Sequence, residues 1–151
     1  MRLGDADRAR FDALVDDVVA SLPEIARRVM DRVAVVVLDR PTRAMVADVA
    51  PGEPYDEVAD ELCGLHTGVA DVDEHLEAPA GPSTIHLFRV GILSQAGGWD
   101  GELLTEEERE AEAEMGFGEE RVREEIRITL LHEIGHQYGL DEDDLADLGY
   151  E

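Results

Sequence analysis

Hydrophobic side chains in the first part of the chain recur at the spacing of an α-helix. Between residues 7 and 30 the apolar positions form one stripe and the aspartates point away from it. Pro23 interrupts this pattern, so Ser21 is placed to cap a second short helix that ends near Arg28. The stripe that predicts the first helix consists of Phe11, Leu14, Val15, Val18, Val19 and Leu22.

Two short apolar runs predict β-strands. Residues 33–38 are a continuous, largely β-branched run, which is typical of a strand buried on both faces. Residues 84–90 alternate instead, with Ile85 and Leu87 on one face and His86 on the other. We therefore expect a small sheet in which at least one strand has a core face and an opposite face.

The segments around these strands carry weaker patterns. Prolines and a glycine make residues 42–54 mostly a loop, and residues 55–65 have the spacing of a short helix. Acidic residues and prolines predict a surface loop over residues 71–82. We expect residues 91–93 to continue the second strand or begin a turn, and residues 94–101 to be a glycine-rich connection.

The last third of the chain is predicted to be helical. Thr105 and Glu108 form a capping box, which places a polar helix at residues 106–114. A long helix follows over residues 119–138, with apolar side chains around most of its circumference. Asp141 is placed to cap a last short helix. Together with the strands, this pattern predicts one α+β domain over residues 1–151, with 94–118 as a possible insertion.

Composition limits the partners of this domain. The formal net charge is −24, and all 13 basic residues are arginine. Such a chain repels nucleic acid and anionic membrane surfaces, so we expect neither as a partner. The charge serves solubility or, alternatively, attracts basic peptides.

Targeting and redox features are few. Cys63 is the only cysteine, which excludes an internal disulfide and a cysteine-based zinc site and favours a small buried side chain. The longest apolar run is too short to cross a bilayer, and no leader pattern opens the chain. We therefore expect a cytoplasmic protein.

The chemistry of the chain is concentrated in the long predicted helix. Its end reads RITLLHEIGHQYGLDE and contains an HExxH motif formed by His132, Glu133 and His136. Two histidines four residues apart share one helical face, so both imidazoles can reach one metal ion. Glu133 is close enough to contact a metal-bound water without being a ligand. The motif therefore predicts a zinc centre with Glu133 as general base.

A third ligand is expected from the residues that follow. Gly139 can adopt the positive φ that ends a helix, and Glu142 is three residues further on. Fifteen residues, 137–151, follow His136, so we expect the ligand to come from nearby rather than from a distant element. Asp143 and an upstream histidine are the alternatives to Glu142, because acidic residues here also suit the first turn of a helix.

Other polar side chains are candidates for contacts with a substrate. Tyr138 and Tyr150 could donate to the oxygen that becomes negative as water adds, although the helical phase of Tyr138 favours the core. His66, His75 and His86 are expected to be surface or capped histidines. His86 is the one to follow, because a strand edge beside the long helix could hold a peptide by backbone pairing.

With these residues in view, the chain resembles the small bacterial zincin-like metallopeptidases, which have a minimal metzincin-like core. The resemblance rests on HEIGHQYGLDEDDLADLG, on the turn at residues 21–24, and on the strand at residues 84–87. It implies an α+β fold with the zinc helix packed under a small sheet. It also implies zinc ligation by His132, His136 and Glu142, with Glu133 as the catalytic base. Larger metzincins carry a methionine below the metal, and none follows Met115 here.

The resulting prediction is a zinc-dependent metallopeptidase, a hydrolase of peptide bonds. Its expected substrate is a peptide or an unfolded protein segment, because so small a domain leaves a shallow, open cleft. Two alternatives remain at this point. One is a catalytically inactive zincin scaffold that binds a protein partner, and the other is a zinc hydrolase of non-peptide amides. The pattern does not indicate an oligomeric state.

Overall fold

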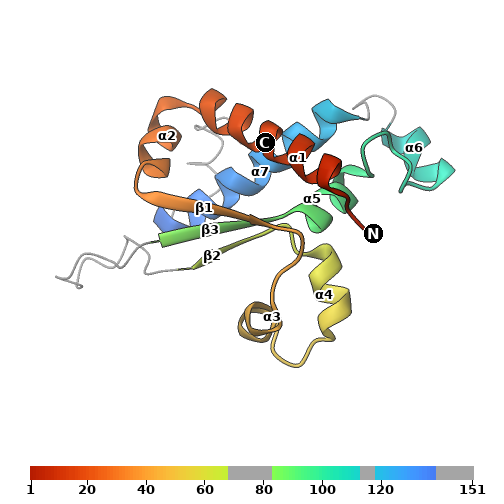
Figure 1. Cartoon of the computed structure of the whole chain (residues 1–151), viewed down its shortest axis with the longest axis horizontal. Coiled ribbons are helices and arrows are strands. Elements are labelled where there is room, and N and C mark those ends of the chain that lie inside the picture. Colours follow the sequence, from red (N-terminus) through yellow and green to blue (C-terminus); the bar gives the residue numbers. More distant parts are fainter. Residues whose placement is uncertain (68–82, 113–117, 139–151) are drawn as a thin grey trace.

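The protein is an α+β domain, seen in a computed structural model that describes residues 1–67, 83–112 and 118–138 (Figure 1). For Glu112 and for residues 136–138 the description covers the backbone alone. The helices are α1 (Asp5–Ser21), α2 (Glu24–Met30), α3 (Arg43–Val49), α4 (Tyr55–Glu61), α5 (Arg89–Ala96), α6 (Glu106–Glu112) and α7 (Glu119–Tyr138). The strands are β1 (Val33–Leu38), β2 (Gly64–Thr67) and β3 (Ser83–Phe88).

The three strands form one sheet in the order β1-β3-β2. The edge strand β1 runs parallel to β3, with Val33 opposite Ser83, and β2 runs antiparallel to β3, with Gly64 opposite Leu87. The central strand β3 therefore has a partner on each side. Among the described residues, β2 is the only antiparallel edge.

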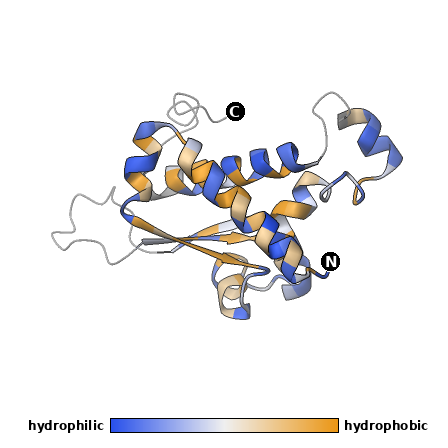
Figure 2. Ribbon diagram, turned by 45° about the horizontal axis from the view of Figure 1, so that its top comes forward, coloured by the Kyte–Doolittle hydropathy of each residue, from blue (hydrophilic) through white to orange (hydrophobic). Residues whose placement is uncertain are grey.

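The core lies between the sheet and the helices on one of its faces (Figure 1). α7 packs against β2 and β3, and α1, α2 and α5 pack against α7. Figure 2 shows the origin of this arrangement: the strands are largely hydrophobic, and the helices carry hydrophobic and hydrophilic stripes. The core therefore combines side chains from the predicted helical stripes and from the inward face of β3. The fully buried large side chains include Phe11, Ile85, Leu87, Ile126, Leu130 and Ile134.

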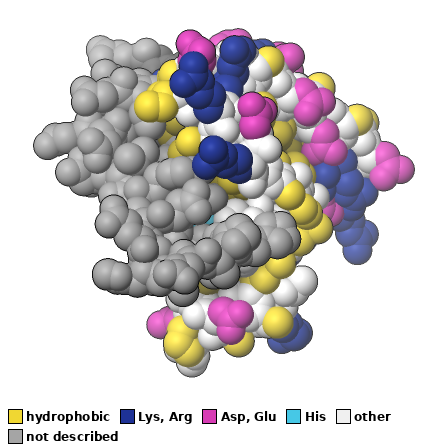
Figure 3. All heavy atoms as spheres, turned by 90° about the vertical axis from the view of Figure 1, so that its left-hand side faces the viewer, with side chains coloured by type: hydrophobic (Ala, Val, Ile, Leu, Met, Phe, Trp, Pro, Cys, Tyr) yellow, Lys and Arg dark blue, Asp and Glu magenta, His cyan; other side chains and the backbone are white. Residues whose placement is uncertain are grey.

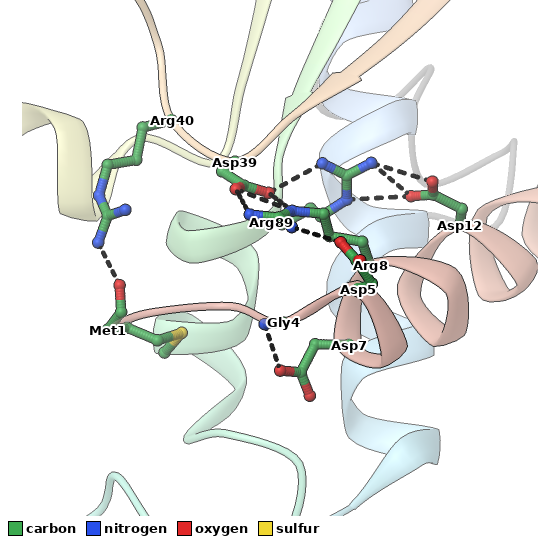
Figure 4. A network of polar contacts seen from close by, with 9 residues as sticks. All are labelled: Met1, Gly4, Asp5, Asp7, Arg8, Asp12, Asp39, Arg40 and Arg89. Atoms are coloured by element: carbon green, nitrogen blue, oxygen red, sulfur yellow. Dashed lines mark hydrogen bonds and ion pairs between the residues drawn. The ribbon is translucent and has the colours of Figure 1, made fainter.

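A polar network fastens α1 to one end of the sheet (Figure 4). Arg89, the first residue of α5, donates from Nε and Nη2 to the Asp12 carboxylate at 2.9–3.0 Å and from Nη1 to Asp39 Oδ1 at 2.9 Å. Arg8 donates to the same Asp39 carboxylate, with Nη2 2.8 Å from Oδ2. The hydrogen bond from Arg8, followed by that from Arg89, holds the pKa of Asp39 below its usual range.

The structure confirms the strongest sequence predictions. The α+β class is confirmed, and the long helix spans the predicted residues, as α7. The first helix breaks at Pro23 as expected. The capping box is also confirmed, since the Glu108 amide donates to Thr105 Oγ1 at 3.1 Å and the Thr105 amide donates to Glu108 Oε1 at 3.2 Å.

Two predicted loops or strand ends are helices instead. Residues 43–49 form α3, because Thr42 accepts a hydrogen bond from the Met45 amide at 3.2 Å and so caps the first turn. Residues 91–93 lie inside α5, which ends where Gly97 adopts a φ of 86°. In both places a short helix formed from residues that lack a strong helical period, so the pattern alone could not find it.

Three smaller predictions were wrong. Ser21 does not cap α2, because its hydroxyl donates to the Val18 carbonyl and Pro23 occupies the cap position. The strand at 33–38 is not buried on both faces: it is an edge strand, and Ala34 and Val36 are exposed. The end of the helix expected over 55–65 is a separate strand, β2.

Some predictions fall outside the described residues, namely the surface loop at 71–82 and the last short helix from Asp141. The insertion proposed for residues 94–118 stays a prediction. Within the described part of the chain, no helix is both long enough and apolar enough to cross a membrane.

Candidate metal centre

The HExxH motif lies on α7, in the continuous helix that the sequence predicted. Positions 132 and 136 are one turn apart on the same side of that helix. The His132 side chain is exposed, whereas Glu133 is buried, with 8% of its surface accessible. The side chain of His136 and residues Gly139, Glu142, Asp143 and Tyr150 lie outside the description, so the predicted ligand set stays a prediction.

The edge strand β2 lies directly against α7 at Glu133, because position 64 is a glycine. A Cβ atom on Gly64 would lie 2.6 Å from Thr129 Cγ2 and 3.4 Å from Glu133 Cγ. It would also lie 3.2 Å from the His86 carbonyl oxygen on the neighbouring strand. The absence of a side chain at position 64 thus lets the strand approach Thr129 closely, with the Glu133 side chain next to this contact.

Glu133 is the last described side chain of a buried polar row along α7. The row repeats every four residues, so it follows one face of the helix, and it consists of Arg121, Glu125, Thr129 and Glu133. Arg121 Nη2 lies 3.2 Å from Glu125 Oε1, with about a tenth of each side chain exposed. Thr129 Oγ1 donates to the Glu125 carbonyl at 2.8 Å. A buried row of this kind is uncommon in a helix that serves only as core.

A partly buried thiol lies next to this interface. Burial, together with the charge of Glu125, raises the pKa of Cys63 to about 11. Cys63 directly precedes β2 and packs against the core, as the sequence suggested for a small buried side chain. A negative charge on the Cys63 sulfur is therefore unfavourable at the start of β2.

His66 lies on the same face of the sheet as Gly64. It stands opposite Ile85, a core residue, while Gly64 stands opposite Leu87, another core residue. Side chains two residues apart on a strand share a face, so His66 is directed to the side where α7 packs. Its Nε2 atom is buried and has no hydrogen-bond partner among the residues that the structure describes.

His86 lies on the opposite face of the sheet, and the role considered for it was wrong. It is on the central strand β3, which is paired on both sides and has no free edge for a peptide. It stands opposite Leu65, facing away from α7, and burial lowers its pKa. The edge next to the candidate centre is β2, a strand that sequence reasoning missed because four residues are too few to show alternation.

The residues present fit a metal centre at this end of α7. Glu133 is buried next to Gly64, and the His132 side chain reaches solvent. Among the described residues, the buried Nε2 nitrogen of His66 has no hydrogen-bond partner. Within the described ranges, no three histidine, cysteine or acidic side chains come together as a metal site. The proposed ligand set includes His136 and Glu142, whose side chains are outside the described part of the chain.

Figure 3 shows the end of the molecule at which β1 and β3 begin and α7 finishes. Arginine side chains gather in the upper part of this face, where Figure 1 places α2, and hydrophobic side chains lie beside them. α2 carries the exposed Arg27 and Arg28. The described part of this face therefore carries basic side chains on α2.

Comparison with known families supports the resemblance. Residues 108–150 match the model of the zincin-like metallopeptidases, a stretch that includes α7 and the HExxH motif. No curated protein matches the chain in sequence. Over this stretch the chain is therefore similar to zincin-like metallopeptidases, and the predicted family resemblance is confirmed.

Proposed function

We propose that the protein is a zinc-dependent peptidase. The proposal depends mainly on one observation: the helix that carries HExxH seats its glutamate, largely buried, against an antiparallel edge strand. A motif on a solvated helix would leave the carboxylate in water. Here Glu133 is held in one place, as a general base must be.

His132, His136 and Glu142 would hold the metal. A zinc ion held by these two imidazoles and one carboxylate would supply a Lewis acid and would lower the pKa of a bound water. Glu133 accepts a proton from the attacking water as its oxygen bonds to the peptide carbonyl carbon. It then passes this proton to the amide nitrogen as the carbon–nitrogen bond breaks, so that an acid and an amine leave.

β2 offers a place for an extended substrate. In the described part of the sheet its outer edge has no partner strand, and the strand lies beside Glu133. A peptide in extended conformation could pair its backbone with this edge and so bring a carbonyl group towards the helix. An open edge of this kind suits unfolded segments and peptides, since a folded protein rarely presents a free strand.

The test compares two glutamine variants of α7. Zinc-loaded protein is incubated with a fluorescence-quenched peptide library, and zinc content is measured in parallel. We expect Glu133→Gln to retain zinc and to lose activity by about 10²- to 10⁴-fold, the usual contribution of a general base. Glu124→Gln is the matched control, because Glu124 is on the same helix, half exposed and paired with Arg127. It should keep full activity.

Two results would contradict the proposal. The first is a zinc-loaded wild-type protein that cleaves no peptide, and the second is an active Glu133→Gln variant. A zinc centre with four protein ligands and no hydrolysis would instead support the non-enzymatic binding module, because a closed site cannot activate water.

A further inference from the structure

We propose that His66 is a catalytic residue of this centre, which rests on the peptidase function proposed above. Its imidazole Nε2–H donates a hydrogen bond to the carbonyl oxygen of the scissile peptide as that oxygen becomes negatively charged. Neither the motif nor the family match includes His66, which lies in β2, far from residues 108–150 in sequence.

The first step of the argument is the direction of β2 relative to α7. Cys63 lies near Glu125, and the next residue, Gly64, lies against Thr129 and Glu133. The strand thus advances towards the carboxyl end of the helix, and Figure 1 shows both elements running towards the same end of the molecule. Beyond Gly64, β2 follows α7 past Glu133.

The second step is the position of His66 along the helix. Two residues of strand advance by about 7 Å, and α7 advances by 1.5 Å per residue, so this is a little over one helical turn. His66 therefore lies at the level of the helical turn that begins at Glu133 and includes position 136. Its side chain is on the α7 side of the sheet, because it stands opposite the core residue Ile85.

The third step is the unused nitrogen. Within residues 1–67, 83–112 and 118–138, the buried His66 Nε2 has no hydrogen-bond partner, although most buried polar groups in proteins have one. If this imidazole served only for packing, its replacement by an apolar side chain would stabilise the folded protein. A buried nitrogen that has no partner within the described chain is suited to a partner that arrives with the substrate.

The fourth step is the division of tasks at the proposed centre. The proposed ligands are His132, His136 and Glu142, so His66 is not needed to hold the metal. The tasks of base and proton carrier fall to Glu133, and stabilising the negative carbonyl oxygen is the remaining task. His66 keeps its Nε2 proton throughout, so the step moves no proton and needs no further reactant.

The test uses three full-length variants loaded with zinc and a library peptide that the wild-type protein cleaves. His66→Phe keeps an aromatic ring and removes the donor, and His66→Gln restores an N–H near the same position. The control is His86→Phe, since His86 also has a buried, unpartnered nitrogen but faces away from α7. Zinc affinity is measured with a competing fluorescent chelator.

We expect His66→Phe to lower kcat by about 10²-fold with little change in KM, the effect of losing one oxyanion donor. Zinc affinity should stay at the wild-type value. The kcat of His66→Gln should be about tenfold or more above that of His66→Phe. His86→Phe should leave kcat unchanged. Binding of methylphosphonate, a tetrahedral anion, to the zinc-loaded protein should weaken by about tenfold in His66→Phe, as for one charge-assisted hydrogen bond.

Several results overturn the inference. They are an unchanged kcat in His66→Phe, a rise in KM alone, a loss of zinc affinity, or a Gln variant no better than the Phe variant. If wild-type protein cleaves no peptide, the proposed function fails, and methylphosphonate decides about His66 separately. In that case the role of His66 is contradicted if the wild type and His66→Phe bind methylphosphonate equally well, or if neither binds it. If His66→Phe does not fold, His66→Gln and His66→Leu form the same comparison.

Discussion

Two polar clusters lie at different places along the same core, and they are organised in opposite ways. Around Arg89, three nitrogens of one guanidinium meet carboxylate oxygens of Asp12 and Asp39, and Arg8 completes the set. At the β2–α7 interface, Glu133 is buried beside Gly64. In the described part of the chain, the first cluster pairs its arginines with carboxylates, whereas His66 in the second cluster has a buried nitrogen without a hydrogen-bond partner.

This difference separates the tasks of the two clusters. A closed network fixes the ends of α1, β1 and α5 relative to one another, and it needs nothing from outside. A buried centre with unused capacity is less favourable for folding, so it is retained where a ligand or a substrate completes it. On this comparison, changes near Arg89 should alter stability, and changes near Glu133 should alter chemistry.

The largest effect is expected from Gly64→Ala. The new methyl group would meet Thr129 Cγ2 at 2.6 Å and Glu133 Cγ at 3.4 Å, so β2 and the side chains of α7 must move apart. Overpacking of this kind costs about 1–3 kcal/mol of unfolding free energy. Displacing the base by a fraction of an ångström to 1 Å should also lower kcat by about 10²-fold. Urea unfolding and peptide hydrolysis measure the two effects.

A second substitution tests whether this contact is the cause. Thr129→Ser deletes the Cγ2 atom that the new methyl group would meet and keeps the hydroxyl that bonds to the Glu125 carbonyl. In the Gly64→Ala/Thr129→Ser double variant, both stability and activity should recover in part. A double variant as impaired as Gly64→Ala would show that the close approach is not what matters.

A smaller and different effect is expected from Arg89→Met. The substitution keeps much of the buried stem and removes the charge, which leaves Asp12 and Asp39 without their shared partner. Because Asp12 is about half exposed, we expect a loss of about 1–3 kcal/mol, less than for a fully buried pair. The activity per folded molecule should not change. A loss of kcat at full folding would remove the distinction between the two clusters.

The pH dependence of stability offers a check on this network. The pKa of Asp39 is lowered from its ordinary value of 3.8, chiefly by the hydrogen bond from Arg8. A lowered pKa means that the carboxylate stabilises the fold above pH 3.8, and that this contribution is lost as pH falls through the folded-state pKa. The stability difference between wild type and Asp39→Asn should therefore be full at pH 6 and shrink in acid.

The parts of the molecule with strong local patterns could be predicted from the sequence. The period of 3.6 gave α1 and α7 correctly, and the alternation of Ile85, His86 and Leu87 gave the core face of β3. The HExxH motif needs only a helix to bring its positions together, so its placement on α7 followed directly.

The rest depends on contacts between distant segments, which no local pattern contains. β2 is a strand because it pairs with β3, and its four residues give no period. Gly64 and His66 become part of the candidate centre only when that pairing sets them against α7. The unpartnered His66 nitrogen likewise becomes visible only in three dimensions.

The most direct test of the account is a description of the metal and its ligands. Zinc content and zinc X-ray absorption are measured for the wild-type protein and for His132→Ala. We expect one zinc per chain in the wild type, coordinated by two imidazoles and by oxygen from a carboxylate and water, and a loss of most zinc in the variant. A wild-type protein that binds no zinc, or that holds zinc equally well without His132, would contradict the account.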